Sequence, residues 1–314
     1  MKAVCSMKEN TSSRLQFALS TVILGTIGMV SRALPLPSTF VTLVRGIIGS
    51  LFLLAVLGLK KEKLDFGAIR KNLIPLAVSG MLLAVTMCLL YESYAYLTVG
   101  TATMFFNTAP IIVVAISPLL FREKMTGHKL ACVGVACVGV VCISGIIENG
   151  LPKTLSEATG ILIAMSGAFT YAAVMVVNKK IRDIPAFDKT IVQLLSFPLI
   201  LVPYNLITGS FSGFTITPRF GFLLLVMGTV YGGLSYLLYF GNLDKIPSAT
   251  AALLCYLEPV TAILVSALIL REPVTAVNLL GAALILGSAA VSELPLRPRR
   301  QAASSKAESM EGLI

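Results

Sequence analysis

Charged side chains are scarce in this sequence of 314 residues. Asp, Glu, Lys and Arg together make up 13% of the chain, whereas 56% of the residues are apolar, and the mean hydropathy is +0.88. A soluble domain needs a larger charged share, typically about 25%, to cover its surface. The composition therefore excludes an ordinary soluble protein and indicates an integral membrane protein.

Residues that carry catalysis or hold metals are also few. The chain has one histidine, His128, and no tryptophan, and its six cysteines form no Cys-x-x-Cys pair. Five of the cysteines lie inside apolar segments, where small polarizable side chains serve as packing residues. The motifs H-E-x-x-H and G-x-S-x-G and a glycine-rich phosphate-binding loop do not occur. We therefore expect no enzyme, no metal and no cofactor.

The apolar residues come in blocks of about twenty, the length that carries a helix across a hydrocarbon core of roughly 30 Å. We predict an all-α protein of ten transmembrane helices. The predicted spans are residues 14–31, 38–58, 73–95, 99–120, 128–147, 157–178, 190–208, 219–240, 248–270 and 274–293. The first block has a basic start but no small-residue cleavage site, so we interpret it as a retained helix. Residues 1–12 form a polar tail, and we expect residues 294–314 to be disordered.

Lysine and arginine are distributed unevenly between alternate connecting segments. If the N-terminus lies inside, the inner segments hold 20 of the 25 basic residues, the outer segments hold 4, and Arg45 lies within a span. This bias predicts that both termini are cytoplasmic. It also accounts for the net charge of +10 without a nucleic-acid partner, because no basic face with interleaved aromatic residues is present.

The chain repeats itself at an offset of 149 residues. Residues 101–126 and 250–275 are identical at 8 of 26 positions, including a mid-span proline and a later Arg-Glu pair. The matched residues include Pro110 with Pro259, Arg122 with Arg271 and Glu123 with Glu272. Because the offset covers five predicted spans, an odd number, the second copy is expected to be inverted in the membrane. Inverted repeats are typical of transporters that alternate access around a central site, so we predict two halves, residues 13–147 and 157–293.

Ten spans in two halves, together with the second copy of the repeated motif, resemble the EamA family of the drug/metabolite transporter superfamily. The motif reads Tyr256-Leu257-Glu258-Pro259-Val260 and continues with Leu270-Arg271-Glu272-Pro273-Val274-Thr275. The resemblance covers residues 13–293 and implies export or exchange of small organic metabolites, often amino acids, in the bacterial inner membrane. Ala109 stands where the second copy has Glu258, so the two halves are not expected to contribute identical residues to a site.

Three ionisable residues fall within predicted spans or at their edges, namely Arg45, Glu92 and Glu258. A charge at the centre of a membrane helix costs about 2.5–3.5 kcal/mol on insertion scales, so such residues face a partner or a wet cavity. Arg45 and Glu92 lie at similar depths, which is compatible with a buried ion pair or with an Arg45 that binds a substrate carboxylate. Glu258 either binds a ligand amine or a proton, or it hydrogen-bonds to a neighbouring helix.

Other candidates are uncharged. Asn107, Gln193, Tyr236 and Tyr256 are candidate lining residues of a substrate cavity, with packing or interfacial anchoring as the alternative. Pro110 and Pro259 each leave the carbonyl four residues earlier without its helical donor and bend the helix. The bend is either a packing kink or a hinge.

These observations favour a secondary transporter of a small metabolite, embedded in the lipid bilayer, and they leave a homodimer open. One alternative is a nucleotide-sugar or phosphorylated-metabolite antiporter of the same superfamily, which needs several basic residues at cavity depth. The other alternative is a non-transporting membrane scaffold or sensor.

Overall fold

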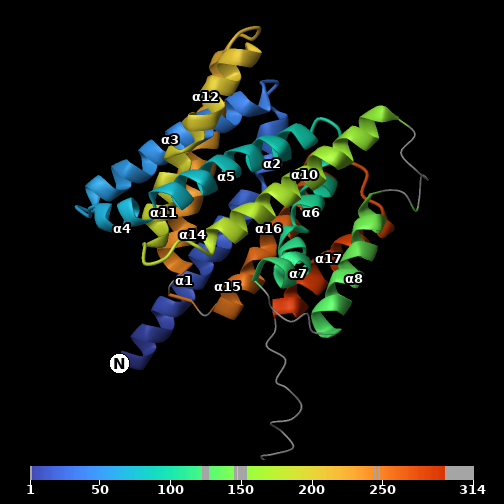
Figure 1. Cartoon of the computed structure of the whole chain (residues 1–314), viewed down its shortest axis with the longest axis horizontal. Helices are drawn as coiled ribbons and strands as arrows, with labels where there is room; N and C mark the ends of the chain where they lie inside the picture. The colour runs from blue at the N-terminus through green and yellow to red at the C-terminus, as the bar shows by residue number, and fades with distance from the viewer. Residues whose placement is uncertain are drawn as a thin grey trace, which may run out of the picture.

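A computed structural model describes residues 2–121, 127–144, 147, 154–243, 245–246 and 248–293. Within these ranges every regular element is a helix, and no strand occurs. The predicted tail at 294–314 and the pair Arg122 and Glu123 lie outside the described residues. Figure 1 shows that helices from opposite ends of the chain intermix, with α1 beside α14 and α15.

The described residues of the first half form the helices α1 to α8. They are α1 (Lys2–Gly25), α2 (Ile27–Arg32), α3 (Ser38–Leu59), α4 (Phe66–Lys71), α5 (Leu73–Ser93), α6 (Val99–Phe106), α7 (Ala109–Phe121) and α8 (Gly127–Ile143). The first helix thus begins well before residue 14, the predicted start of the first span.

The second half contains two π-helical segments among its α-helices. Its elements are α10 (Leu155–Asn178), α11 (Ala186–Leu195), α12 (Phe197–Thr208), α13 (Pro218–Val226), η1 (Met227–Leu234), α14 (Ser235–Leu243), α15 (Ser248–Cys255), α16 (Leu257–Leu264), η2 (Val265–Ile269) and α17 (Ala276–Glu293).

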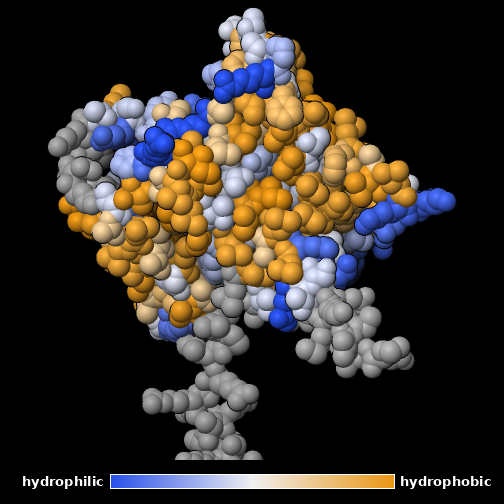
Figure 2. All heavy atoms as spheres, turned by 180° about the vertical axis from the view of Figure 1, so that it is seen from behind, coloured by the Kyte–Doolittle hydropathy of each residue, from blue (hydrophilic) through white to orange (hydrophobic). Residues whose placement is uncertain are grey.

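Helices cover all ten predicted segments, but their lengths differ. Seven are long and apolar enough to cross a membrane: Thr11–Arg32, Ser38–Leu59, Leu73–Ser93, Val99–Ile116, Leu155–Asn178, Ala186–Thr208 and Pro218–Leu243. Three apolar helices are shorter, namely Leu130–Ile143, Leu257–Ile269 and Ala276–Val291. Apolar side chains also cover most of the face shown in Figure 2. The prediction of a multi-pass helical membrane protein is therefore confirmed, while the number of ten crossings stays a prediction.

The two halves interlock, and the pattern of packing is the same when the halves are exchanged. Helix α1 packs against α14 and α16, just as α10 packs against α5 and α7. Helix α3 packs against η1, as α11 and α12 pack against α5, and α8 pairs with α17. The last pair touches through backbone: a Cβ on Gly281 would lie 2.7 Å from the carbonyl oxygen of Gly139. Small residues of this kind allow close helix approach where lipid provides no hydrophobic driving force.

The two proline-containing segments are both interrupted at equivalent places. Helix α6 ends at Phe106 and α15 ends at Cys255, which are separated by the repeat offset of 149 residues. Pro110 and Pro259 fall in the first turn of the helices that follow, where a missing N–H leaves no intrahelical bond unmade. Each proline thus follows a break between two helices, whereas the predicted bend and the hinge role stay predictions.

Candidate substrate site

Arg45, in the middle of α3, is the centre of the candidate site. Its side chain is buried, with 2% of the residue surface exposed. Nη1 donates to the hydroxyl of Tyr91 at 2.7 Å and to Sδ of Met87 at 3.1 Å. Nη2 donates to the backbone carbonyl of Tyr231 and to the hydroxyl of Tyr236, both at 3.1 Å. The partners come from α5 in the first half and from η1 and α14 in the second half, so one guanidinium joins the two halves.

The π-helix η1 explains why a carbonyl from the second half reaches Arg45. π-Helical turns are rare and concentrate at functional sites. Gly232 lies in this segment, and a Cβ on it would sit 2.9 Å from the carbonyl oxygen of Arg45. The missing side chain lets η1 approach α3 closely enough for Tyr231 to accept a hydrogen bond. The ring of Tyr236 adds a cation–π contact, with its centroid 5.5 Å from the guanidinium carbon.

One donor of Arg45 stays unused. Its Nε is buried and has no hydrogen-bond partner among the described residues. No carboxylate in the described part of the chain forms an ion pair with it. A buried donor without an acceptor costs about 1–3 kcal/mol. Arg45 is therefore an uncompensated cation with a free N–H, which suits an incoming anion.

Glu258 provides the opposite charge in the same region. It lies in the first turn of α16, its side chain is half-buried, and its carboxylate makes no hydrogen bond to a described residue. Its charge interacts with that of Arg45 without a direct ion pair. Tyr94 and Tyr171 are further electrostatic neighbours of Glu258. A carboxylate and a guanidinium thus stand near each other, each with hydrogen-bonding capacity left over.

The ion pair between Arg45 and Glu92 that the sequence allowed is not formed. Arg45 bonds instead to Tyr91, the residue before Glu92 in α5. Successive residues of an α-helix point about 100° apart, so a helix that turns Tyr91 toward Arg45 turns Glu92 away. Glu92 is half-buried near the end of α5.

Three uncharged candidates have other surroundings. Nε2 of Gln193 donates to Ser79 Oγ at 2.6 Å and to Asn178 Oδ1 at 2.9 Å, in a network that ties α5, α10 and α11 together. Asn107 donates to the carbonyl of Thr103 in its own helix, at 2.8 Å. Tyr256 occupies the break between α15 and α16 and packs against a small buried apolar cluster. Of the seven candidates, the structure brings Tyr236 into contact with Arg45 and places Glu258 within electrostatic reach of it.

Sequence reasoning missed several residues of the site. Sequence reasoning did not single out Tyr91 or Tyr231, but the hydroxyl of Tyr91 and the backbone carbonyl of Tyr231 both accept hydrogen bonds from Arg45. The signal that could have found Tyr231 is the glycine-rich run around it, because Gly228 and Gly232 indicate close helix contact. In the sequence, Arg271 and Glu272 stood out only as part of the repeated motif. Glu272 pairs with Arg32.

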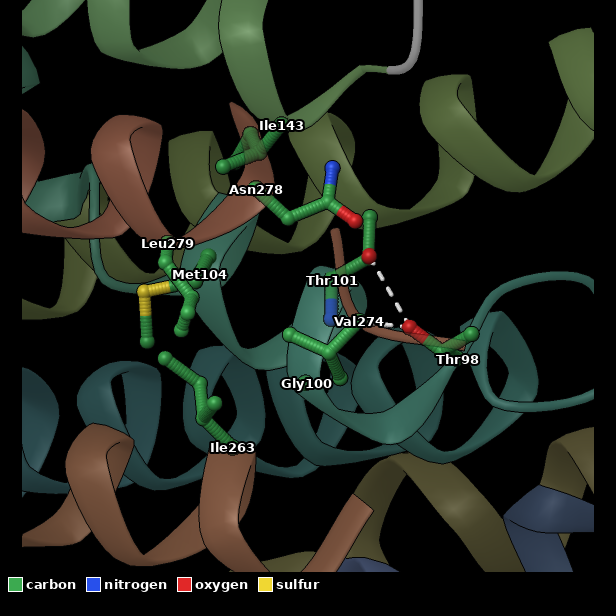
Figure 3. A pocket seen from close by; sticks show the side chains of 9 residues that line it. All are labelled: Thr98, Gly100, Thr101, Met104, Ile143, Ile263, Val274, Asn278 and Leu279. Atoms are coloured by element: carbon green, nitrogen blue, oxygen red, sulfur yellow. Dashed lines mark hydrogen bonds between the residues drawn. The ribbon is translucent and has the colours of Figure 1, made fainter. Parts of the chain in front are cut away.

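Two hollows lie away from Arg45. The first, shown in Figure 3, has a volume of about 10 Å³, which is room for roughly one water molecule. Its polar wall includes Thr98, Thr101 and Asn278, and the two threonine hydroxyls are hydrogen-bonded at 2.9 Å. The second, of about 300 Å³, lies between α4 and the segment after α10, where Lys71 and Asp183 line it. The first hollow is too small to hold a metabolite, so it is not an alternative to the Arg45 region as a substrate site.

Comparisons with known proteins agree with this architecture. The family model described as the EamA-like transporter family matches residues 12–145 and 158–293. The uncharacterized transporter YxxF of Bacillus subtilis (strain 168) is 25% identical over 264 residues, which cover 82% of each chain. An uncharacterized transporter of Clostridium kluyveri is 25% identical over 76% of this chain and 78% of its own. A solved crystal structure shares the fold with a TM-score of 0.62 and 14% identity, over 90% of this chain and 96% of that one.

Proposed function

Because the chain belongs to the EamA-like transporter family, we propose that it is a secondary transporter that exports or exchanges small zwitterionic metabolites such as amino acids. Its general class, a membrane transporter, follows from the family and from the relatives that share most of its length. The substrate class and the mechanism are our proposal. No phosphate-binding loop for ATP occurs in the sequence, which favours secondary transport.

The observation that carries the proposal is the incomplete pairing of Arg45 and Glu258. The Nε–H of Arg45 lacks an acceptor among the described residues, and Glu258 lies within electrostatic reach of it. A substrate carboxylate bound to Arg45 and a substrate ammonium bound to Glu258 would satisfy both. Charge-assisted hydrogen bonds of this kind are about twice as strong as neutral ones.

Alternating access between inverted halves is the mechanism that we propose. The symmetric packing of the halves and the equivalent breaks after Phe106 and Cys255 support it. Pro110 and Pro259 would act as hinges at these breaks. Since Arg45 receives partners from both halves, a rocking motion would remake its hydrogen bonds and so link the site to the conformational change.

Neither alternative function gains support. An antiporter of nucleotide sugars needs several cations at the site, but Arg45 is the only buried Lys or Arg among the side chains that the structure describes. A scaffold has no use for a buried cation that keeps an unused hydrogen-bond donor.

Purified protein in liposomes tests the substrate class. We expect vesicles loaded with an unlabelled amino acid to take up at least one radiolabelled amino acid from a panel that also contains nucleotide sugars. Protein-free vesicles are the control. Folded protein that exchanges none of the amino acids would contradict the zwitterion proposal, and exchange of nucleotide sugars alone would establish the antiporter.

Cysteine labelling tests the inversion. Glu62 and Ser212 are exposed residues that follow the second and seventh predicted spans, so they occupy equivalent places in the two halves. Inverted halves require Glu62→Cys and Ser212→Cys to react with a membrane-impermeant maleimide from opposite faces. Labelling of both from one face would disprove the inversion.

A further inference from the structure

Glu272 is a buried carboxylate outside the Arg45 region. It follows η2, and 8% of its side chain is exposed. Its carboxylate forms an ion pair with Arg32 and accepts hydrogen bonds from the hydroxyl of Ser266 and from the backbone N–H of Val99, the latter at 2.9 Å. This is the only ion pair between side chains of the described residues. We call Arg32, Val99, Ser266 and Glu272 the latch.

The latch joins three segments that are distant in sequence. Arg32 ends α2, Val99 begins α6, and Ser266 lies in η2 of the second half. The first N–H groups of a helix have no partner within the helix, and a carboxylate there also meets the positive end of the helix dipole. Glu272 therefore binds two positive partners of the first half, a guanidinium and a helix N-terminus, from its own place in the second half.

This placement bears on the transport cycle. Helices α6 and η2 belong to the two interrupted segments, and the latch holds the ends of these segments together on one side of the membrane. Motion at the breaks after Phe106 and Cys255 that separates these ends would have to part Val99 from Glu272. We propose that Glu272 is a positioning residue of the transport cycle: the latch keeps the pathway closed on its side and breaks when that side opens.

The inference rests on the proposed alternating access, but its test needs no substrate. Thr103 is buried one helical turn, about 6 Å, below Val99 on α6. The six native cysteines are replaced by alanine, and Thr103→Cys is introduced as the reporter. Its reactivity records how easily a labelling reagent reaches the interior beneath the latch. Arg271→Cys, at an exposed position beside the latch, identifies the face on which the latch lies.

The measurement is the rate of labelling by a membrane-impermeant maleimide in intact cells and in inside-out vesicles. With the latch intact, we expect slow labelling of the reporter from the latch face. Glu272→Gln and Arg32→Gln should each accelerate it about tenfold or more from that face alone, because hydrogen bonds to charged groups contribute about 1.5–3 kcal/mol. Arg32→Lys keeps the charge and should keep labelling slow.

Controls separate a gate from general loosening. Glu62→Gln removes an exposed carboxylate elsewhere and should leave labelling unchanged. If Glu272→Gln fails to fold, Ser266→Ala removes one donor of the latch and should give a severalfold acceleration from the latch face. Unchanged labelling in the folded variants, or equal acceleration from both faces, would overturn the inference. One-sided acceleration in a protein that exchanges no amino acid would support the latch and count only against the proposed substrate.

Discussion

Replacing Arg45 with lysine keeps the positive charge but removes the planar fork that the structure uses. The guanidinium donates to Tyr91, Met87, Tyr236 and the Tyr231 carbonyl, and its Nε is left for a ligand. An ammonium group has three donors on a single nitrogen. It cannot reach both the acceptors of Nη1 on α5 and those of Nη2 on η1 and α14. At least one hydrogen bond to a second-half partner should therefore be lost.

The expected magnitudes differ for stability and for transport. Each lost hydrogen bond to a charged group contributes about 1.5–3 kcal/mol, and we expect Arg45→Lys to reduce the free energy of unfolding by that amount. Loss of the Nε contact to a substrate carboxylate costs a similar amount of binding energy. Because about 1.4 kcal/mol corresponds to a tenfold change, KM for exchange should rise roughly tenfold to a hundredfold.

Two assays on the same preparation check this prediction. Exchange in liposomes gives KM, and thermal unfolding in detergent with and without the transported amino acid gives the stabilisation by ligand, which should be smaller in the variant. Arg219→Lys is the matched control, because Arg219 is exposed at the start of α13. If Arg45→Lys and Arg219→Lys have the same KM, Arg45 does not bind the substrate and the reasoning from its free Nε is wrong.

Three further variants separate transport from packing. Glu258→Gln should abolish exchange, or its dependence on pH, at normal expression, whereas unaltered exchange at every pH in the liposome assay would remove Glu258 from the mechanism. Gly281→Leu places a side chain against the Gly139 carbonyl, 2.7 Å from the position of a Cβ, and overpacking should lower the unfolding free energy by about 1–3 kcal/mol in a thermal melt. Gln193→Leu should destabilise the fold by about 1–3 kcal/mol, because Asn178 and Ser79 lose a buried partner, while KM stays unchanged. A raised KM for Gln193→Leu would instead place Gln193 in the substrate path.

The sequence predicted the elements of the fold well, because the bilayer imposes both their length and their composition. Apolar blocks located each of the seven helices in the described ranges that are long enough to span the membrane, and the breaks near Asn107 and Tyr256 lie just before the repeated prolines. The seventh predicted segment shows the limit of this reasoning. Its helix begins at Ala186, before the predicted start at residue 190, and is interrupted at Ser196, just before Pro198 in the first turn of α12.

The site was predicted only in part, because the rotation of each helix about its axis is not visible in a uniformly apolar sequence. Tyr91 and Glu92 are neighbours, and only the packed structure shows that Tyr91 faces Arg45. The partners of Glu272 were missed for a related reason. Arg32 lies 240 residues earlier in the chain, whereas the adjacent Arg271 has a backbone φ of 54°, in the left-handed region, and an exposed side chain. Long-range pairs of this kind follow from topology rather than from local pattern.

The hydrogen bonds of Arg45 have a consequence for how the protein is made. Its partners Tyr231 and Tyr236 are synthesised 186 and 191 residues after it. Met87 and Tyr91 on α5 follow it too, by 42 and 46 residues, so the guanidinium has none of these partners when α3 enters the bilayer, at an insertion cost of about 2.5–3.5 kcal/mol. We therefore expect α3 to stay beside water or the insertion machinery until η1 and α14 arrive. The biogenesis of this chain thus depends on late assembly of its second half around a charge delivered by the first.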